Sequence, residues 1–81
     1  MEKEIGKITH IFDKIDVAIL ELTDTLKVGD NIHVVGSTTD FEQIIDSMQV
    51  EHKNIDNAGK GDIVGIKLAA KAKVGDKIYL R

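Results

Sequence analysis

Short apolar segments separated by polar, glycine-containing stretches follow one another along the whole chain. In residues 6–12, Ile8 and Phe12 share one parity and polar residues interrupt the other, the alternation of a half-buried strand. Residues 17–22 are apolar on both parities as far as Glu21, which predicts a central strand with a neighbour on each side. We expect the two segments to pair as a β-hairpin.

Each of three later apolar segments is entered through a Gly-Asp pair. Glycine tolerates a positive φ angle and an aspartate side chain can bond its own local backbone, so the pair reverses the chain without strain. We expect a turn followed by a strand at Gly29-Asp30, Gly61-Asp62 and Gly75-Asp76. The tetrapeptide Lys-Val-Gly-Asp occurs at 27–30 and again at 73–76, but its flanks share little, which favours a recurring turn over an internal duplication.

Residues 40–55 carry two conflicting patterns. The apolar side chains from Phe41 to Met48 recur at helical spacing, and Thr39 with Glu42 fits a capping box. Ile44, Met48, Val50 and His52 also share strand parity, with Asp46 as the exception. The neighbouring strands, moreover, need antiparallel partners to cover their edges. We therefore interpret the segment as strand.

Length and composition restrict the class of protein. A chain of 81 residues forms one domain, residues 1–81, because a second core needs roughly 50 more residues. The absence of cysteine excludes disulfides and thiolate chemistry and is typical of a cytoplasmic protein. The longest uncharged apolar run, Val17 to Leu20, is too short for a bilayer, and the charged amino terminus does not fit a signal peptide, so we expect no membrane association.

The net charge of −3 conceals an uneven distribution. Residues 1–51 hold 4 Lys against 11 Asp and Glu, whereas residues 52–81 hold 7 Lys and Arg against 3 Asp. The basic half contains no dense arginine cluster and no interleaved aromatic residues, so ordinary solvated lysines are its simpler interpretation.

Several of these features recur in a fixed order: Leu26-Lys27-Val28-Gly29-Asp30, Ser47-Met48, Ala58-Gly59-Lys60-Gly61-Asp62-Ile63-Val64-Gly65, and Val74-Gly75-Asp76. With the Gly6-Lys7-Ile8 opening they resemble domain 2 of elongation factor Tu-like translational GTPases, from Ile5 to Leu80. The resemblance implies an all-β fold, a closed six-stranded antiparallel Greek-key barrel of the translation-protein type. No G-x-x-x-x-G-K-[ST] loop is present, so nucleotide hydrolysis is not carried over.

The chain is also similar to the carboxyl-terminal domain of the collagenase-like peptidase family. This similarity lies in the opening Gly6-Lys7-Ile8-Thr9-His10 and in Met48-Gln49-Val50-Glu51-His52. Some members of that family are implicated in RNA modification rather than proteolysis.

Candidate residues for binding RNA or another partner fall into two groups. The elongation-factor resemblance implies contact with the aminoacyl end of tRNA through the loop that holds Asp56, Asn57 and Lys60. Phosphate contacts need positioned cations, and the basic half supplies Lys67, Lys71, Lys73, Lys77 and Arg81. Tyr79 alternates with apolar neighbours, so its ring should face outward and stack on a base or a protein partner.

We predict no catalytic residue, no metal and no cofactor. His10, His33 and His52 lie in separate segments, without the spacing that preforms a zinc site. Ser37 and Ser47 belong to no recognisable arrangement of nucleophile and base. The domain is therefore expected not to be an enzyme.

Two functions fit these observations. The first is a stand-alone, translation-linked module that contacts tRNA, rRNA or a ribonucleoprotein. The alternative is a protein–protein adaptor accessory to a collagenase-like enzyme, which the acidic first half and the low net charge favour. The sequence specifies neither the partner nor the oligomeric state.

Overall fold

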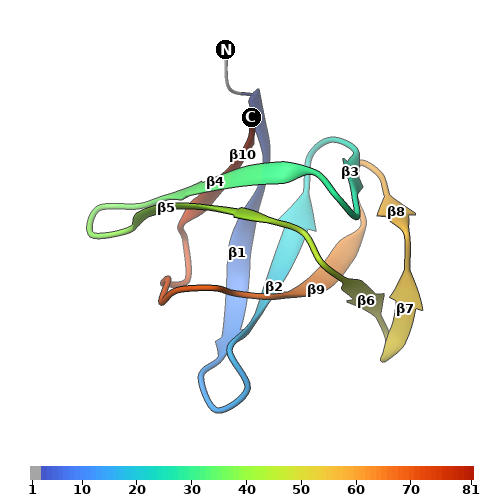
Figure 1. Cartoon of the computed structure of the whole chain (residues 1–81), viewed down its shortest axis with the longest axis horizontal. Coiled ribbons are helices and arrows are strands. Elements are labelled where there is room, and N and C mark those ends of the chain that lie inside the picture. Colours follow the sequence, from blue (N-terminus) through green and yellow to red (C-terminus); the bar gives the residue numbers. More distant parts are fainter. Residues whose placement is uncertain (1–2) are drawn as a thin grey trace.

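The computed structural model describes residues 3–81, which form antiparallel β-strands and no helix (Figure 1). Eight strands make one sheet in the order β5-β4-β10-β1-β2-β9-β6-β7, and β3 with β8 makes a second sheet. The strands are β1 (Lys3–Phe12), β2 (Val17–Leu22), β3 (Leu26–Lys27), β4 (Asn31–Val35), β5 (Asp40–Ile44), β6 (Met48–Val50), β7 (Lys53–Ile55), β8 (Asn57–Ala58), β9 (Ile63–Lys67) and β10 (Lys77–Leu80). The described residues contain no helix long and apolar enough to cross a membrane.

One cluster of aliphatic side chains forms the core. Ile8, Leu20, Val64 and Ile78, from four strands of the large sheet, are each 1% exposed or less. Alternate residues of these strands point into the cluster, as the period of two requires. Burial of each such side chain contributes about 1.5–3 kcal/mol, which makes the cluster the main source of stability.

The β1–β2 hairpin contains a β-bulge that reverses the predicted orientation of Phe12. Thr9 is an extra residue between the pairs that Ile8 and His10 make with consecutive residues of β2. Because side chains alternate along a strand, one extra residue moves every later side chain to the opposite face. Ile11 therefore packs against the core and Phe12 is 46% exposed. The predicted hairpin is confirmed, but its predicted parity is wrong beyond the bulge.

The three Gly-Asp pairs adopt one turn geometry. Their glycines have positive φ angles, 96° at Gly29, 89° at Gly61 and 95° at Gly75. In each turn the aspartate carboxylate accepts a hydrogen bond from the backbone N–H three residues earlier, at 2.9, 2.9 and 2.8 Å respectively. The predicted turns are confirmed, and the local bond explains why aspartate follows the glycine.

Each of these turns also holds one buried residue of a distant segment. The glycine N–H donates to the carbonyl of that residue, and the aspartate carbonyl accepts from its N–H, all at 2.8 or 2.9 Å. The turns at 27–30, 59–62 and 73–76 hold, in that order, Ile45, Leu22 and Ile8. All three residues are 1% exposed. A single local motif therefore reverses the chain and also anchors the core.

Residues 40–55 are extended, so the prediction of strand over helix is confirmed. The segment is nevertheless interrupted twice. Strand β5 pairs with β4, whereas β6 pairs with β9 and β7. Ile45 turns into the core between β5 and β6, where the 27–30 turn holds it. Glu51 and His52 then form the turn of the β6–β7 hairpin.

The all-β antiparallel architecture is as predicted, but the closed six-stranded barrel is not found. Within residues 3–81 the large sheet has eight strands, and its outermost strands, β5 and β7, do not pair with each other. The reason is the inward turn at Ile45, which leaves β5 paired with β4 alone. Gln43 of β5 instead reaches the end of β9 through its side chain: Nε2 donates to the Lys67 carbonyl at 2.8 Å and Oε1 accepts from the Ala69 N–H at 2.7 Å.

Candidate protein-docking groove

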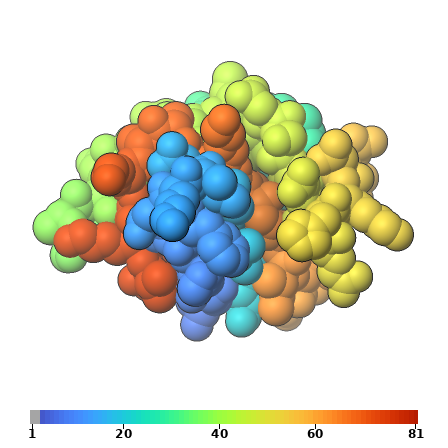
Figure 2. Space-filling view, turned by 90° about the horizontal axis from the view of Figure 1, so that it is seen from below, coloured from blue at the N-terminus to red at the C-terminus, as the bar shows by residue number. Residues whose placement is uncertain are grey.

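An apolar groove lies on the outward face of β2 and β9. Its first wall is the end of β1 and the following turn, which carry Phe12 and Ile15, 46% and 60% exposed. The bulge at Thr9 directs Phe12 to this wall, where its ring packs edge-on against His10 with centroids 4.6 Å apart. Figure 2 shows this wall in blue and the β6–β7 hairpin in yellow, with β9 in orange between them.

Gly65 forms the floor of the groove. A Cβ at this position would lie 3.5 Å from Ile19 Cδ1 and 3.6 Å from Val17 Cγ1, both ordinary van der Waals distances. The position therefore has room for a side chain, and glycine leaves this room open. Glycine inside a strand lowers stability and often marks a site that another group approaches closely.

The second wall is the tip of the β6–β7 hairpin. Val50 pairs with Lys53, which leaves a two-residue turn of Glu51 and His52 with φ angles of 51° and 66°. Asparagine and glycine usually supply this left-handed conformation in such turns. The chain holds two larger polar side chains there instead, and both line the groove.

The groove has a volume of about 650 Å³ and an uneven electrostatic character. Its apolar lining is Phe12, Ile15, Val17, Ile19, Val50, Ile63 and Val64. The carboxylates of Glu51 and Asp62 and the imidazole of His52 are its ionisable groups, and no lysine or arginine among the described residues lines it. The surface is therefore suited to an apolar side chain that has positive charge beside it.

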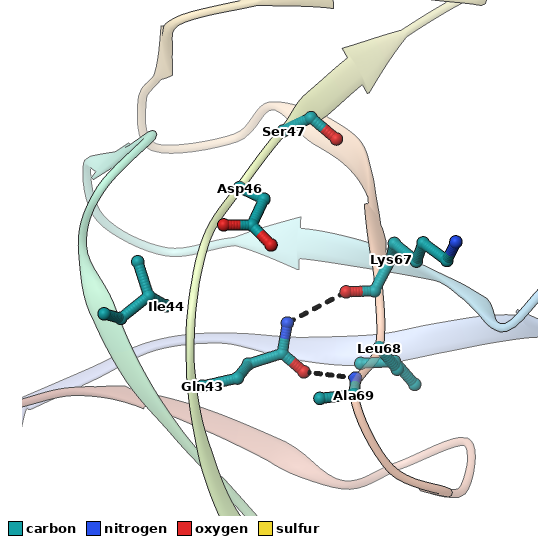
Figure 3. Close-up of a pocket in the computed structure, with 7 residues that line it drawn as sticks. All are labelled: Gln43, Ile44, Asp46, Ser47, Lys67, Leu68 and Ala69. Carbon is teal, nitrogen blue, oxygen red and sulfur yellow. Dashed lines mark hydrogen bonds between the residues drawn. The ribbon is translucent and has the colours of Figure 1, made fainter.

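A second hollow, of about 490 Å³, lies where the side chain of Gln43 spans the gap between β5 and β9 (Figure 3). Gln43, Asp46, Ser47 and the segment from Lys67 to Ala69 contribute to its lining. The amide of Gln43 is satisfied by its two backbone partners. This hollow is therefore a structural junction of the sheet.

The residues of the predicted basic stripe lie in different elements. Lys77 of β10 has its Nζ 3.5 Å from Glu4 Oε1, and Arg81 pairs with Glu42, so acidic partners accompany both cations. Lys67 ends β9, which β1 and β2 separate from β10 in the sheet. Lys71 and Lys73 are exposed in the connection between β9 and β10.

The other predicted residues are scattered as well. Asn57 begins β8 and pairs with Lys27 of β3, Asp56 precedes it, and Lys60 lies in the 59–62 turn. Tyr79 is half-buried in β10 opposite His33. None of the nine candidate residues lines the groove, and their roles in partner binding stay predictions.

Two hydrogen bonds lower the pKa of the Asp24 carboxylate. Lys3 donates a side-chain hydrogen bond to Asp24, and the Thr25 backbone N–H donates a second at 2.7 Å. Together they hold the pKa of Asp24 below its ordinary value of 3.8, with a smaller contribution from the charge of Lys60. Asp24 and its partners lie outside the groove.

The three histidines lie apart. His10 packs on Phe12, His33 Nε2 contacts Asp40 Oδ1, and His52 is at the hairpin tip. Within residues 3–81 no group of three or more His, Cys, Asp or Glu side chains is placed to hold a metal ion.

Sequence reasoning missed the groove because two of its features leave no simple trace in the sequence. The bulge at Thr9 reverses Phe12 without any Gly or Asn to mark it. Ile63, 58% exposed, directly follows the Gly61-Asp62 turn, and no pattern in the sequence connects it with Phe12. The one available signal was Gly65, a glycine in the middle of a strong strand pattern.

Known proteins share this antiparallel β-domain. No protein-family model matches the chain. It is 42% identical over 78 residues to an uncharacterised protease of Methanocaldococcus jannaschii and 30% identical over 77 residues to a collagenase of Porphyromonas gingivalis. These matches cover 95% and 93% of the chain but only 19% and 21% of the relatives, so the chain spans about a fifth of their length.

Solved structures show the same fold. Two crystal structures of the C-terminal domain of a putative U32 peptidase from Geobacillus thermoleovorans superpose with TM-scores of 0.90 and 0.88. The superpositions cover 95% and 94% of the chain and 90% and 96% of those domains, at 18% identity. The chain therefore has the fold of such a domain.

The comparisons correct the leading functional prediction. The expectation of a translation-linked, RNA-binding relative of elongation-factor domain 2 is wrong, because the relatives are a protease, collagenases and the C-terminal domain of a putative peptidase. The second resemblance, to the carboxyl-terminal domain of collagenase-like peptidases, is confirmed. These findings support the adaptor interpretation.

Proposed function

We propose that this domain is a non-catalytic docking module that binds the catalytic part of a U32-type peptidase. The observation that carries the proposal is the likeness of nearly the whole chain to one fifth of larger proteases. The remaining four fifths of such a protein provide a natural partner, whether the two parts belong to one chain or to two.

The physical properties of the domain support binding over catalysis. A domain of this size uses most of its aliphatic residues for a single core, and the cluster between the strands contains most of them. Large apolar side chains that stay exposed on such a small protein indicate an interaction surface. Phe12, Ile15 and Ile63 meet this description and lie together in one groove.

The test is reconstitution from two purified components. The 81-residue chain and the catalytic part of a U32-type peptidase from the same genome are mixed after nuclease treatment, and complex formation is measured by sedimentation and calorimetry. We expect a one-to-one complex with a Kd of about 10 μM or tighter. Two components that sediment independently at about 100 μM would contradict the proposed function.

A further inference from the structure

We propose that the groove is the docking site itself and that it receives an aliphatic side chain flanked by lysine or arginine, presented by the catalytic part of the peptidase. This inference rests on the proposed function and adds its location and its chemistry. Three observations carry it: the clustering of exposed apolar residues, the open position at Gly65, and the sign of the charges along the groove.

Three exposed, large apolar side chains lie on the same face of the domain. Phe12, Ile15 and Ile63 are 46%, 60% and 58% exposed, and all three line the same groove. The half-buried Val17, Ile19 and Val50 extend the apolar surface between them. Apolar side chains that gather in one hollow, rimmed by polar residues, are typical of an interaction site.

Gly65 defines the place for one inserted side chain. The hollow above it is bounded by Ile19 and Val17, which a Cβ on Gly65 would already touch. A Cβ would fit there without disturbing the backbone, because the nearest backbone atom outside its chain neighbours, the Gln49 carbonyl oxygen, would lie 3.8 Å from it. Glycine therefore keeps the hollow open, at some loss of strand stability.

The charges define what flanks the inserted side chain. Glu51 and Asp62 lie along the groove, and no lysine or arginine among residues 3–81 lines it. An acidic rim attracts a partner that carries positive charge and repels one that carries carboxylates. The partner side chain is therefore expected to lie between basic residues.

Relatives supply the identity of the partner. The proteins that share this domain are about five times as long, since the chain covers 19–21% of them. Domains of one chain contact each other through interfaces that resemble transient protein–protein interfaces. The competing occupant is a second copy, whose exposed Val74 adjoins Lys73 and offers similar chemistry. Such a head-to-tail contact produces a ring of molecules if its rotation closes and an open chain if it does not.

The experiment compares two isoleucines with nearly equal exposure. Ile63 is 58% exposed in the groove, whereas Ile44 is 57% exposed and lines only the hollow beside Gln43. The affinity of each variant for the catalytic part is measured by calorimetry. We expect Ile63→Ser to weaken binding by about fivefold or more and Ile44→Ser to change it by less than about twofold.

Two further variants test the hollow and the charge. Gly65→Val fills the hollow and should weaken binding by about tenfold while unfolding at the same or a higher urea concentration than the parent. Glu51→Lys should also weaken binding, and the parent complex should weaken as salt is raised. Tighter binding by Glu51→Lys would show an acidic partner and overturn the inferred chemistry.

The outcomes separate the two proposals. If the parent binds the catalytic part, and Ile63→Ser and Gly65→Val bind it with the same affinity, the groove is not the docking site. The proposed function would still stand. Absence of any complex with the parent would overturn both. Self-association of the chain alone that Gly65→Val abolishes would show a second copy as the occupant and overturn the inferred partner.

Discussion

The carboxylate of Asp76 occupies the space that a side chain at Gly36 would need. A Cβ on Gly36 would lie 1.9 Å from Asp76 Oδ1 and 2.5 Å from its Cγ. Asp76 is only 6% exposed, and its Oδ2 accepts a hydrogen bond from the Lys73 N–H at 2.8 Å. The carboxylate therefore cannot move away without losing that bond.

Gly36→Ala is expected to lower the free energy of unfolding by about 1–3 kcal/mol, because either the Asp76 bond breaks or the strand end shifts. Urea unfolding followed by circular dichroism measures the change. Gly59→Ala is the matched control, since a Cβ there meets no atom within 4 Å and φ is not positive. An equal loss in both variants would contradict the steric explanation.

The aspartates of the Gly-Asp turns should be replaceable by asparagine but not by alanine. In Asp30→Ala the Lys27 N–H loses its acceptor, which should lower the free energy of unfolding by about 1 kcal/mol. Asp30→Asn keeps an oxygen in the same place and should retain most of the stability. Thermal unfolding of both variants checks this, and equal destabilisation would show that the charge, rather than the hydrogen bond, is what matters.

Gln43 should hold the end of β9 in place. Gln43→Ala removes both side-chain bonds, to the Lys67 carbonyl and from the Ala69 N–H, and should lower the free energy of unfolding by about 1–2 kcal/mol. Native-state hydrogen exchange provides the more specific readout, because the Ala69 amide beyond the end of β9 should exchange faster while Ile66 within β9 stays protected. Unchanged exchange at Ala69 would contradict this role.

The pKa of Asp24 should rise when Lys3 is replaced. The low pKa of Asp24 in the folded state means that the interaction stabilises the fold above the unfolded-state pKa and is lost as pH falls through the folded one. In Lys3→Met the carboxyl titration measured by NMR should move up toward its ordinary value, and added salt should have the same effect on the parent. Because Asp24 is partly exposed, a large loss of stability at neutral pH would argue against this simple account.

Local chemistry made part of the fold predictable. The properties that make a Gly-Asp pair form a turn are local to the two residues, so all three turns could be predicted from the sequence. The β1–β2 hairpin could be predicted as well. The choice of strand for residues 40–55 required one further argument, the need of neighbouring strands for partners.

The rest depended on contacts between distant segments. The interruption at Ile45 results from the 27–30 turn, and nothing near Ile45 in the sequence indicates it. The bulge at Thr9 likewise depends on how β1 fits β2, and it decides whether Phe12 is in the core or in the groove. The candidate groove was missed for this reason. The charge pattern pointed to the cations from Lys67 to Arg81 as a binding surface, whereas the groove is lined mainly by apolar side chains whose exposure depends on these distant contacts.

The pairing of the first strand with the last has a consequence for protein engineering. Lys3 of β1 lies opposite Leu80 of β10, so the two ends of the described chain leave the molecule side by side (Figure 1). A host protein could therefore receive the whole domain within a surface loop, because entry and exit require almost the same point in space. Such an insertion would keep the groove accessible. Binding of a partner in the groove would then change the distance between two fluorescent labels on the host, which can be measured.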